Sequence, residues 1–165
     1  MKKYLFVAVL AVASLAAYAQ PRAIGANLGS GLGFSYQHGF GESNMLDVNA
    51  SVPVLTGWGI GGSVTYDWID PFNAPVPWNE KGEWHWYMGV GGTAGIYDFS
   101  NIAWNAGVAG HIGIEYDFWF PLQLSLDWRP NIGVTNYAGA GNDHKLGFNH
   151  WGLYSGISLG VRYKF

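Results

Sequence analysis

The sequence predicts an all-β protein: a transmembrane up-and-down antiparallel β-barrel of eight strands. Large apolar residues alternate with small or polar ones along most of the chain, which is typical of strands whose two faces meet different surroundings. Charged residues make up 12% of the chain, fewer than a soluble surface usually carries, and aromatic residues make up 17%. After the N-terminal segment, no apolar run is long enough for a spanning helix of ~20 residues.

The N-terminus predicts export. Lys2 and Lys3 precede the apolar residues 4–15, and a small-residue cleavage site follows at residues 17–19. An N-terminal membrane anchor is the alternative, but the apolar core is too short to span a bilayer. The chain has no cysteine, which excludes lipoprotein anchoring, disulfides and thiolate metal sites. We therefore expect a cleaved signal peptide, residues 1–19, and one barrel domain, residues 20–165.

Seven alternating runs follow the signal peptide. The first four put large apolar residues at even positions and small or polar residues at odd ones; they cover residues 24–36, 46–54, 58–68 and 84–96. The fifth and sixth runs, residues 104–118 and 122–134, keep the even register. The last run, residues 151–165, has its apolar residues at odd positions. A period of two held this long indicates sheet and argues against helix.

The number of strands leaves two alternatives, because single-chain bacterial barrels use an even number and one of the seven runs must be split. A split at Pro130–Asn131 uses a residue that interrupts strand ladders. A split at Gly29, Ser30 and Gly31 uses a tight turn, and it makes the connection at 70–83 periplasmic. Loop lengths favour the first, which makes the longer connections extracellular (38–44, 70–83 and 138–149). The unbroken alternation of residues 122–134 favours the second.

Hydrocarbon offers no hydrogen bonds, so the apolar face of such a barrel must lie outside, the polar face must line the lumen, and the sheet must close. A soluble β-sandwich core is the alternative for the apolar stripe, but its outer face would carry more charge. Aromatic residues near the strand ends on the apolar face predict an interfacial girdle. These residues are Trp58, Trp68, Trp84, Trp86, Trp104, Tyr116, Trp128, Trp151 and Tyr163.

The lumen carries most of the charge. An eight-stranded barrel is only wide enough for side chains to fill, and buried charges must pair. We therefore expect Glu115 and Asp127 to pair with Arg129 and Arg162 in a network that plugs the bore. The alternative is a proton or ion path lined by His111 and Glu115. The charged or ionisable residues that should point inward are Asp47, Asp67, His85, His111, Glu115, Asp117, Asp127, Arg129, Arg162 and Lys164.

Three stretches carry a resemblance to a known class: residues 113–116 (Gly-Ile-Glu-Tyr), the run at 121–130, and the closing Gly-Val-Arg-Tyr-Lys-Phe. Together with the export signal and the glycine-rich strands, they resemble the small outer-membrane barrels of Bacteroidota, and more broadly the OmpA/OmpX-type eight-stranded barrels. The resemblance implies a Gram-negative outer-membrane location, reached through the periplasm. It also implies contact with outer-membrane lipid, barrel-assembly machinery and periplasmic chaperones, and favours a monomer. Val161, Tyr163 and Phe165 would form the assembly signal in the last strand.

The sequence names no chemistry. Its five histidines form no readable Ser/His/acid set, so we expect no catalytic residues, and we expect no cofactor and no metal. Acidic residues outnumber basic ones by 11 to 8 without a basic patch, which argues against a nucleic-acid partner. The proline- and aromatic-rich residues 70–78 could contact a partner. The expected function is a non-enzymatic structural or surface-contact barrel; a narrow, porin-like pore for ions or small solutes and a lipid-modifying enzyme are the alternatives.

Overall fold

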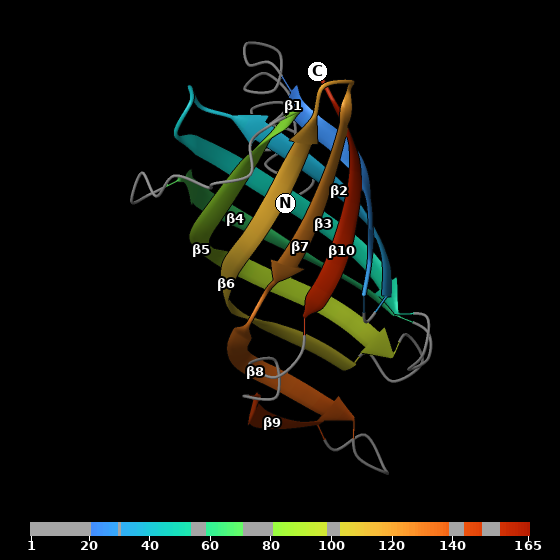
Figure 1. Cartoon of the computed structure of the whole chain (residues 1–165). Coiled ribbons are helices and arrows are strands. Elements are labelled where there is room, and N and C mark those ends of the chain that lie inside the picture. The colour runs from blue at the N-terminus through green and yellow to red at the C-terminus, as the bar shows by residue number, and fades with distance from the viewer. Residues whose placement is uncertain are drawn as a thin grey trace, which may run out of the picture.

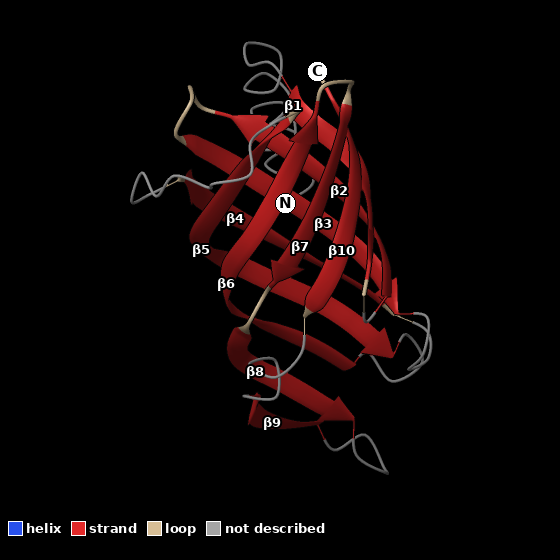
Figure 2. Cartoon of the chain, in the orientation of Figure 1, coloured by secondary structure: helices blue, strands red, loops and turns tan. Residues whose placement is uncertain are grey.

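The computed structural model describes residues 21–29, 31–53, 59–70, 81–98, 103–138, 144–149 and 156–165. The predicted signal peptide lies outside these residues. All regular structure in the described part is β-strand, as Figure 2 shows by colour. The strands are β1 (Pro21–Leu28), β2 (Gly31–Gly39), β3 (Asn44–Pro53), β4 (Ile60–Ile69), β5 (Gly82–Asp98), β6 (Ala103–Phe118), β7 (Leu122–Trp128), β8 (Asn131–Ala138), β9 (His144–Asn149) and β10 (Ile157–Lys164). Within the described residues, no helix is long and apolar enough to cross a membrane.

The strands form one closed antiparallel barrel with eight positions around its wall (Figure 1). Each strand from β1 to β6 pairs with the next, and β1 closes the wall by pairing with β10. The long strand β6 pairs with β7 along one half and with β8 along the other, so β7 and β8 share the seventh position. β9 pairs with β8, and β10 pairs with β7, so these two strands share the eighth. The predicted eight-stranded up-and-down barrel is confirmed.

The reversal that completes the strand count lies at Gly29–Gly31, and the alternative split at Pro130 is wrong. Leu28 and Leu32 are register partners across the turn, where the Gly29 amide donates to the Gly31 carbonyl at 3.0 Å. At Pro130 the chain does not turn back, because both flanking strands stay on β6 in one continuous register. Proline removes one amide donor, but its carbonyl still accepts from Gly110 at 2.8 Å. The pairing with β6 on both sides of Pro130 therefore keeps the chain extended despite the one missing hydrogen bond.

The barrel has two distinct ends. We call the end where β1 begins and β10 finishes the terminal end; the connections β2–β3, β4–β5 and β6–β7 also lie there. We call the opposite end the far end; it carries the connections β1–β2, β3–β4, β5–β6 and β8–β9. The β8–β9 hairpin extends the wall at the far end, at the bottom of Figure 1. The connection between β4 and β5 therefore falls on the same end as the last residue.

The predicted faces are confirmed: apolar side chains cover the outside and polar ones fill the inside. The interior has a small apolar cluster, formed by Met45, Ile69 and Tyr87, and is otherwise largely polar. This polarity is the reverse of a soluble sandwich core, so that alternative is wrong. Exposed apolar residues occur on nearly every strand, and include Leu28, Phe34, Val52, Val64, Val90, Val108, Ile112, Leu124, Leu126, Val134, Leu159 and Val161.

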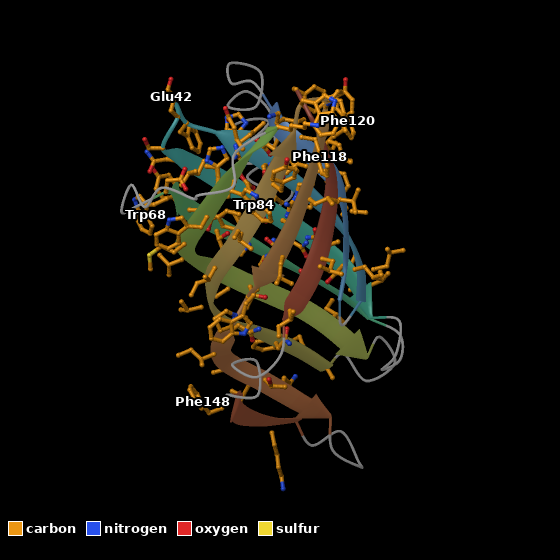
Figure 3. All side chains as sticks on the ribbon, viewed as in Figure 1. Glu42, Trp68, Trp84, Phe118, Phe120 and Phe148 are labelled. Carbon is orange, nitrogen blue, oxygen red and sulfur yellow. The ribbon has the colours of Figure 1, made fainter. Side chains whose placement is uncertain are left out.

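Aromatic side chains gather on the outside near the terminal end (Figure 3). Their ring contacts include Tyr66 with Trp68 at 5.5 Å between centroids, and Trp84 with Tyr116 at 4.9 Å. Of the predicted girdle, Trp68, Trp84, Tyr116 and Tyr163 belong to this belt, and Trp86 lies nearby on β5. Trp128 lies midway along the wall and Trp104 lies at the far end. Trp58 and Trp151 lie outside the described residues.

Candidate functional site

Six ionisable side chains meet in the middle of the lumen. They come from opposite parts of the wall, and all are buried because alternation turns them inward on strands that face one another across a narrow bore. We call them the central cluster: Asp47 on β3, Asp67 on β4, His111 on β6, Asp127 on β7, Arg129 directly after β7, and Arg162 on β10.

Arg162 lies at the heart of this cluster, with 1% of its surface exposed. Its guanidinium approaches two carboxylates, Asp127 at 3.4 Å and Asp47 at 3.7 Å. Its remaining N–H groups donate to neutral side chains: Nε to Ser35 Oγ at 2.8 Å, and Nη1 to Ser125 Oγ at 2.7 Å. A guanidinium has five donors in a fixed plane, so one side chain can bind partners on several strands at once.

Arg129 supplies the second cation. Its Nη2 lies 3.1 Å from an Asp47 oxygen and 3.9 Å from an Asp127 oxygen, and its Nη1 donates to Ser158 Oγ at 3.2 Å. Asp127 therefore lies with both Arg129 and Arg162, as the sequence predicted. Asp47 joins the same pairs, although the predicted network did not include it.

His111 lies between two carboxylates of the central cluster, Asp67 and Asp127. Nδ1 lies 2.9 Å from Asp67 Oδ2, and Nε2 lies 3.3 Å from Asp127 Oδ1. Carboxylates only accept hydrogen bonds, so the ring satisfies both when each nitrogen carries a proton. In that form three cationic groups face the three carboxylates of the central cluster. The lumen is then electrically neutral at its middle.

Glycines on intervening strands let these side chains reach each other. Gly113 lies in register between Tyr87 and Asp127, and the Tyr87 hydroxyl crosses it to donate to Asp127. Gly89 lies in the same way between Asp67 and His111. A Cβ on Gly113 would overlap the Tyr87 ring, and one on Gly89 would overlap the Asp67 carboxylate. The glycine-rich strands thus leave the space that the lumen contacts occupy.

A second group of charges lies toward the terminal end. We call Arg22, Glu115, Asp117 and Lys164 the terminal cluster. Arg22 binds Glu115, while Lys164 Nζ lies 3.0 Å from Asp117. Gln123 connects the two clusters, since its amide donates to Asp117 at 3.0 Å and its oxygen accepts from Arg162 at 3.2 Å. Two cations and two carboxylates leave this cluster neutral as well.

The pairing predicted for Glu115 needs correction. Among the described residues its ion-pair partner is Arg22, rather than Arg129 or Arg162. The reason is axial position: Glu115 lies toward the terminal end, where β1 begins, whereas Arg129 lies toward the far end. The alternating pattern did not predict that Arg22 points inward, because Arg22 precedes the first clear alternating residue, Ile24. Its even position would also have placed it outward, but the register of β1 with β2 shifts between Pro21 and Ala23.

His85 lies at the rim of the terminal end rather than in the clusters. Its Nδ1 contacts Asp70 at 2.6 Å, and its Nε2 lies 3.6 Å from the exposed Glu83. Asp70 also accepts from the Trp86 amide at 3.0 Å, and its backbone has a φ of 45°. This contact therefore anchors the start of the β4–β5 connection.

The far end of the lumen is open and holds a cavity of about 320 Å³. Arg129 is the one charged residue in the described part of its lining. The inward positions here carry small or neutral polar side chains, so they leave space where the central cluster fills the bore. The polar side chains of this far-end cavity belong to Asn27, Asn49, Ser51, Ser63, Thr93, Asn105, Arg129, Asn131 and Ser158.

A hydroxyl–imidazole–carboxylate arrangement does occur in the lumen. Thr65 Oγ1 lies 3.2 Å from His111 Nδ1, and Nε2 of the same imidazole ring faces Asp127. Thr65 is buried, does not line the far-end cavity, and also lies 3.2 Å from Asp67, to which it can donate. Within the described residues, this hydroxyl is therefore enclosed beside Asp67 and His111. His111 and Glu115, the predicted ion path, are each held by partners in different clusters.

The remaining sequence predictions fall on the outer face or outside the described residues. Val161, Tyr163 and Phe165 are exposed on the outside of β10 and just beyond it. Most of the proline-rich stretch 70–78 lies outside the described residues. Where the structure is described, no group of three or more His, Asp or Glu side chains could hold a metal ion.

Comparison of the chain with protein-family models, curated proteins and solved structures gave no match.

Proposed function

We propose that this chain is an integral outer-membrane β-barrel of a Gram-negative bacterium, with a structural or surface-contact role and no enzymatic activity. The observation that carries the proposal is the polarity of the barrel: an apolar outer wall around a polar, charge-balanced lumen. In water, a continuous apolar wall of this kind would be a surface for aggregation. In a bilayer the same wall meets hydrocarbon, and the β1–β10 pairing closes the sheet around the lumen, with β9 in the far-end hairpin paired to β8.

The reversal at Gly29–Gly31 fixes which connections share an end. It places the β4–β5 connection at the terminal end, where β1 begins and β10 finishes. We propose that this end faces the periplasm. The β4–β5 connection is then a long exception to the usual short periplasmic turns, and the far-end cavity opens to the cell exterior.

A closed lumen favours the structural role over the pore. Arg162, Tyr87 and His111 fill the middle of the bore, and their polar groups are engaged with one another or with carboxylates. The far-end cavity is a feature that favours a narrow pore, but Arg129 of the central cluster is part of its lining. We therefore expect the unmutated protein to be electrically silent in planar lipid bilayers. Large, stable currents would reject the plug and support the pore.

Substitution on the wall tests membrane insertion directly. Leu126 is exposed and lies between Ile114 and Leu159 on the neighbouring strands. A cation at this depth of a bilayer costs ~2–4 kcal/mol, whereas in water an exposed arginine costs little. Leu126→Arg should therefore lower the unfolding free energy in lipid vesicles by that amount.

Glu42→Arg, in the exposed β2–β3 turn, is the matched control and should change little (Figure 3). Cell fractionation and a heat-dependent shift in gel mobility complete the test. A protein that stays in the soluble fraction, with Leu126→Arg as stable as the control, would reject the membrane assignment.

A further inference from the structure

The far-end cavity differs from the rest of the lumen in the balance of its hydrogen-bonding groups. Two residues of its lining each carry a buried donor that has no acceptor in the described part of the chain: Arg129 Nε and Asn27 Nδ2. Arg129 is 8% exposed and Asn27 is 3% exposed. A buried donor without an acceptor is costly, so a small rotation that brings either donor to the cavity surface is stabilised when a ligand oxygen accepts from it.

Both donors are held in place by contacts on their other side. Arg129 is fixed by Asp47 and Ser158 through its two Nη atoms, which leaves Nε–H available. Asn27 Oδ1 lies 3.5 Å from Arg162 Nη2. A guanidinium only donates, so the amide oxygen must face Arg162 and the NH₂ group must point elsewhere. These contacts restrict both side chains to small rotations, which limits the entropic cost of binding.

The lining also excludes the opposite kind of ligand. No Asp or Glu is present among the described lining residues, so a cation finds no counter-charge. Three further amides, those of Asn49, Asn105 and Asn131, can turn an NH₂ group toward the cavity. Guanidinium and amide donors together suit the oxygen atoms of carboxylates and phosphates.

We propose that the far-end cavity binds a small solute bearing a carboxylate or phosphate group, held by Arg129 and Asn27 after a small rotation turns their unpaired donors toward it. Its volume of about 320 Å³ lies at the lower end of the range for small-molecule sites. The cavity is part of the barrel itself, so the binding does not depend on the membrane assignment. A solute there rests on the central cluster and does not pass it.

The test uses isotope-labelled full-length barrel refolded in detergent micelles and followed by NMR. Sodium acetate, sodium phosphate, glucose and trimethylammonium chloride are titrated separately at constant ionic strength. Saturable shifts of the Arg129 Nε–H and Asn27 side-chain NH₂ signals are expected with at least one oxyanion, and acetate against phosphate identifies the source. No saturation with either oxyanion, or equal saturation with glucose, would overturn the proposal.

Two variants locate the site. Asn27→Asp keeps an oxygen toward Arg162 but replaces the free donor with a negative acceptor, so oxyanion affinity should fall at least ~10-fold. Asn44→Asp makes the same change at the first residue of β3, at the terminal end, and should leave affinity unchanged. Gly61→Leu should block the cavity, because a Cβ there meets nothing closer than 3.7 Å and the side chain can extend into the space. Binding that survives both Asn27→Asp and Gly61→Leu would show that the oxyanion lies elsewhere.

Discussion

Arg162→Met removes the cation that holds the central cluster together. Methionine retains most of the side-chain length, so the change isolates charge and hydrogen bonding from packing. In the folded barrel, Asp127 and Asp47 lose a guanidinium at 3.4 and 3.7 Å, and Ser35 and Ser125 lose a donor. Water cannot replace these contacts in a filled bore.

The expected loss follows from what the carboxylates retain. Breaking a buried pair by removing one partner costs ~3–5 kcal/mol. Asp47 keeps Arg129 at 3.1 Å, and Asp127 keeps His111 at 3.3 Å, so we expect the lower end of this range, ~3 kcal/mol. Arg162→Lys should lose less, because it keeps the charge while giving up the planar array of donors.

Urea titrations in lipid vesicles, followed by tryptophan fluorescence, measure this free energy. Lys145→Ala, an exposed substitution on β9, is the control and should stay within ~0.5 kcal/mol of the unmutated protein. If Arg162→Met also stays within that margin, the lumen charges do not depend on Arg162, and the account of a paired, filled bore fails.

Three further predictions concern the lumen and the last strand. Gly113→Ala should lower the unfolding free energy by ~1–3 kcal/mol, because its methyl group displaces Tyr87 from Asp127. Gly92→Ala is the control, since its methyl group meets nothing closer than 3.8 Å. Equal unfolding midpoints for the two variants would contradict the role of glycine spacing. Asp67→Asn and His111→Gln should each destabilise, and the double variant should be more stable than their sum by ~0.5–3 kcal/mol; additive losses in the same titration would mean that the two side chains are not coupled. Deletion of Phe165 should lower the amount of assembled barrel measured by heat-dependent gel mobility, and unchanged levels in competition with the unmutated protein would argue against an assembly signal.

Alternation predicted the faces of the wall well, because a strand turns every second side chain to the same side. Asp47, Asp127 and Arg162 point inward as expected, and Leu126 and Val161 point outward. Alternation does not report where the chain reverses. Residues 122–134 keep one register through Pro130, where an amide donor is missing from the strand ladder. The chain instead reverses at Gly29–Gly31.

Partner identity was harder to predict, since it depends on axial position and on the glycines between strands. Glu115 could be placed in the lumen, but its pairing with Arg22 required the register of β1 against β2 and β10. Tyr87 shares the odd, inward parity of His85 and Gly89, yet an aromatic residue in a run of outward aromatics did not stand out. The far-end cavity arises from small residues on many strands, and no single run reveals it.

The closure between β1 and β10 has a consequence for the order of events during assembly. Arg162 reaches Ser35 and Asn27 across 127 and 135 positions of sequence, so these contacts form only after a large loss of chain entropy. Until that moment, Asp47 lacks Arg162, whereas Asp127 can already contact it because β7 and β10 are paired strands. An uncompensated carboxylate resists transfer from water into hydrocarbon. In the proposed membrane setting, an unclosed sheet is thus held back at the bilayer surface, and neutralisation by the final strand favours entry of the completed barrel.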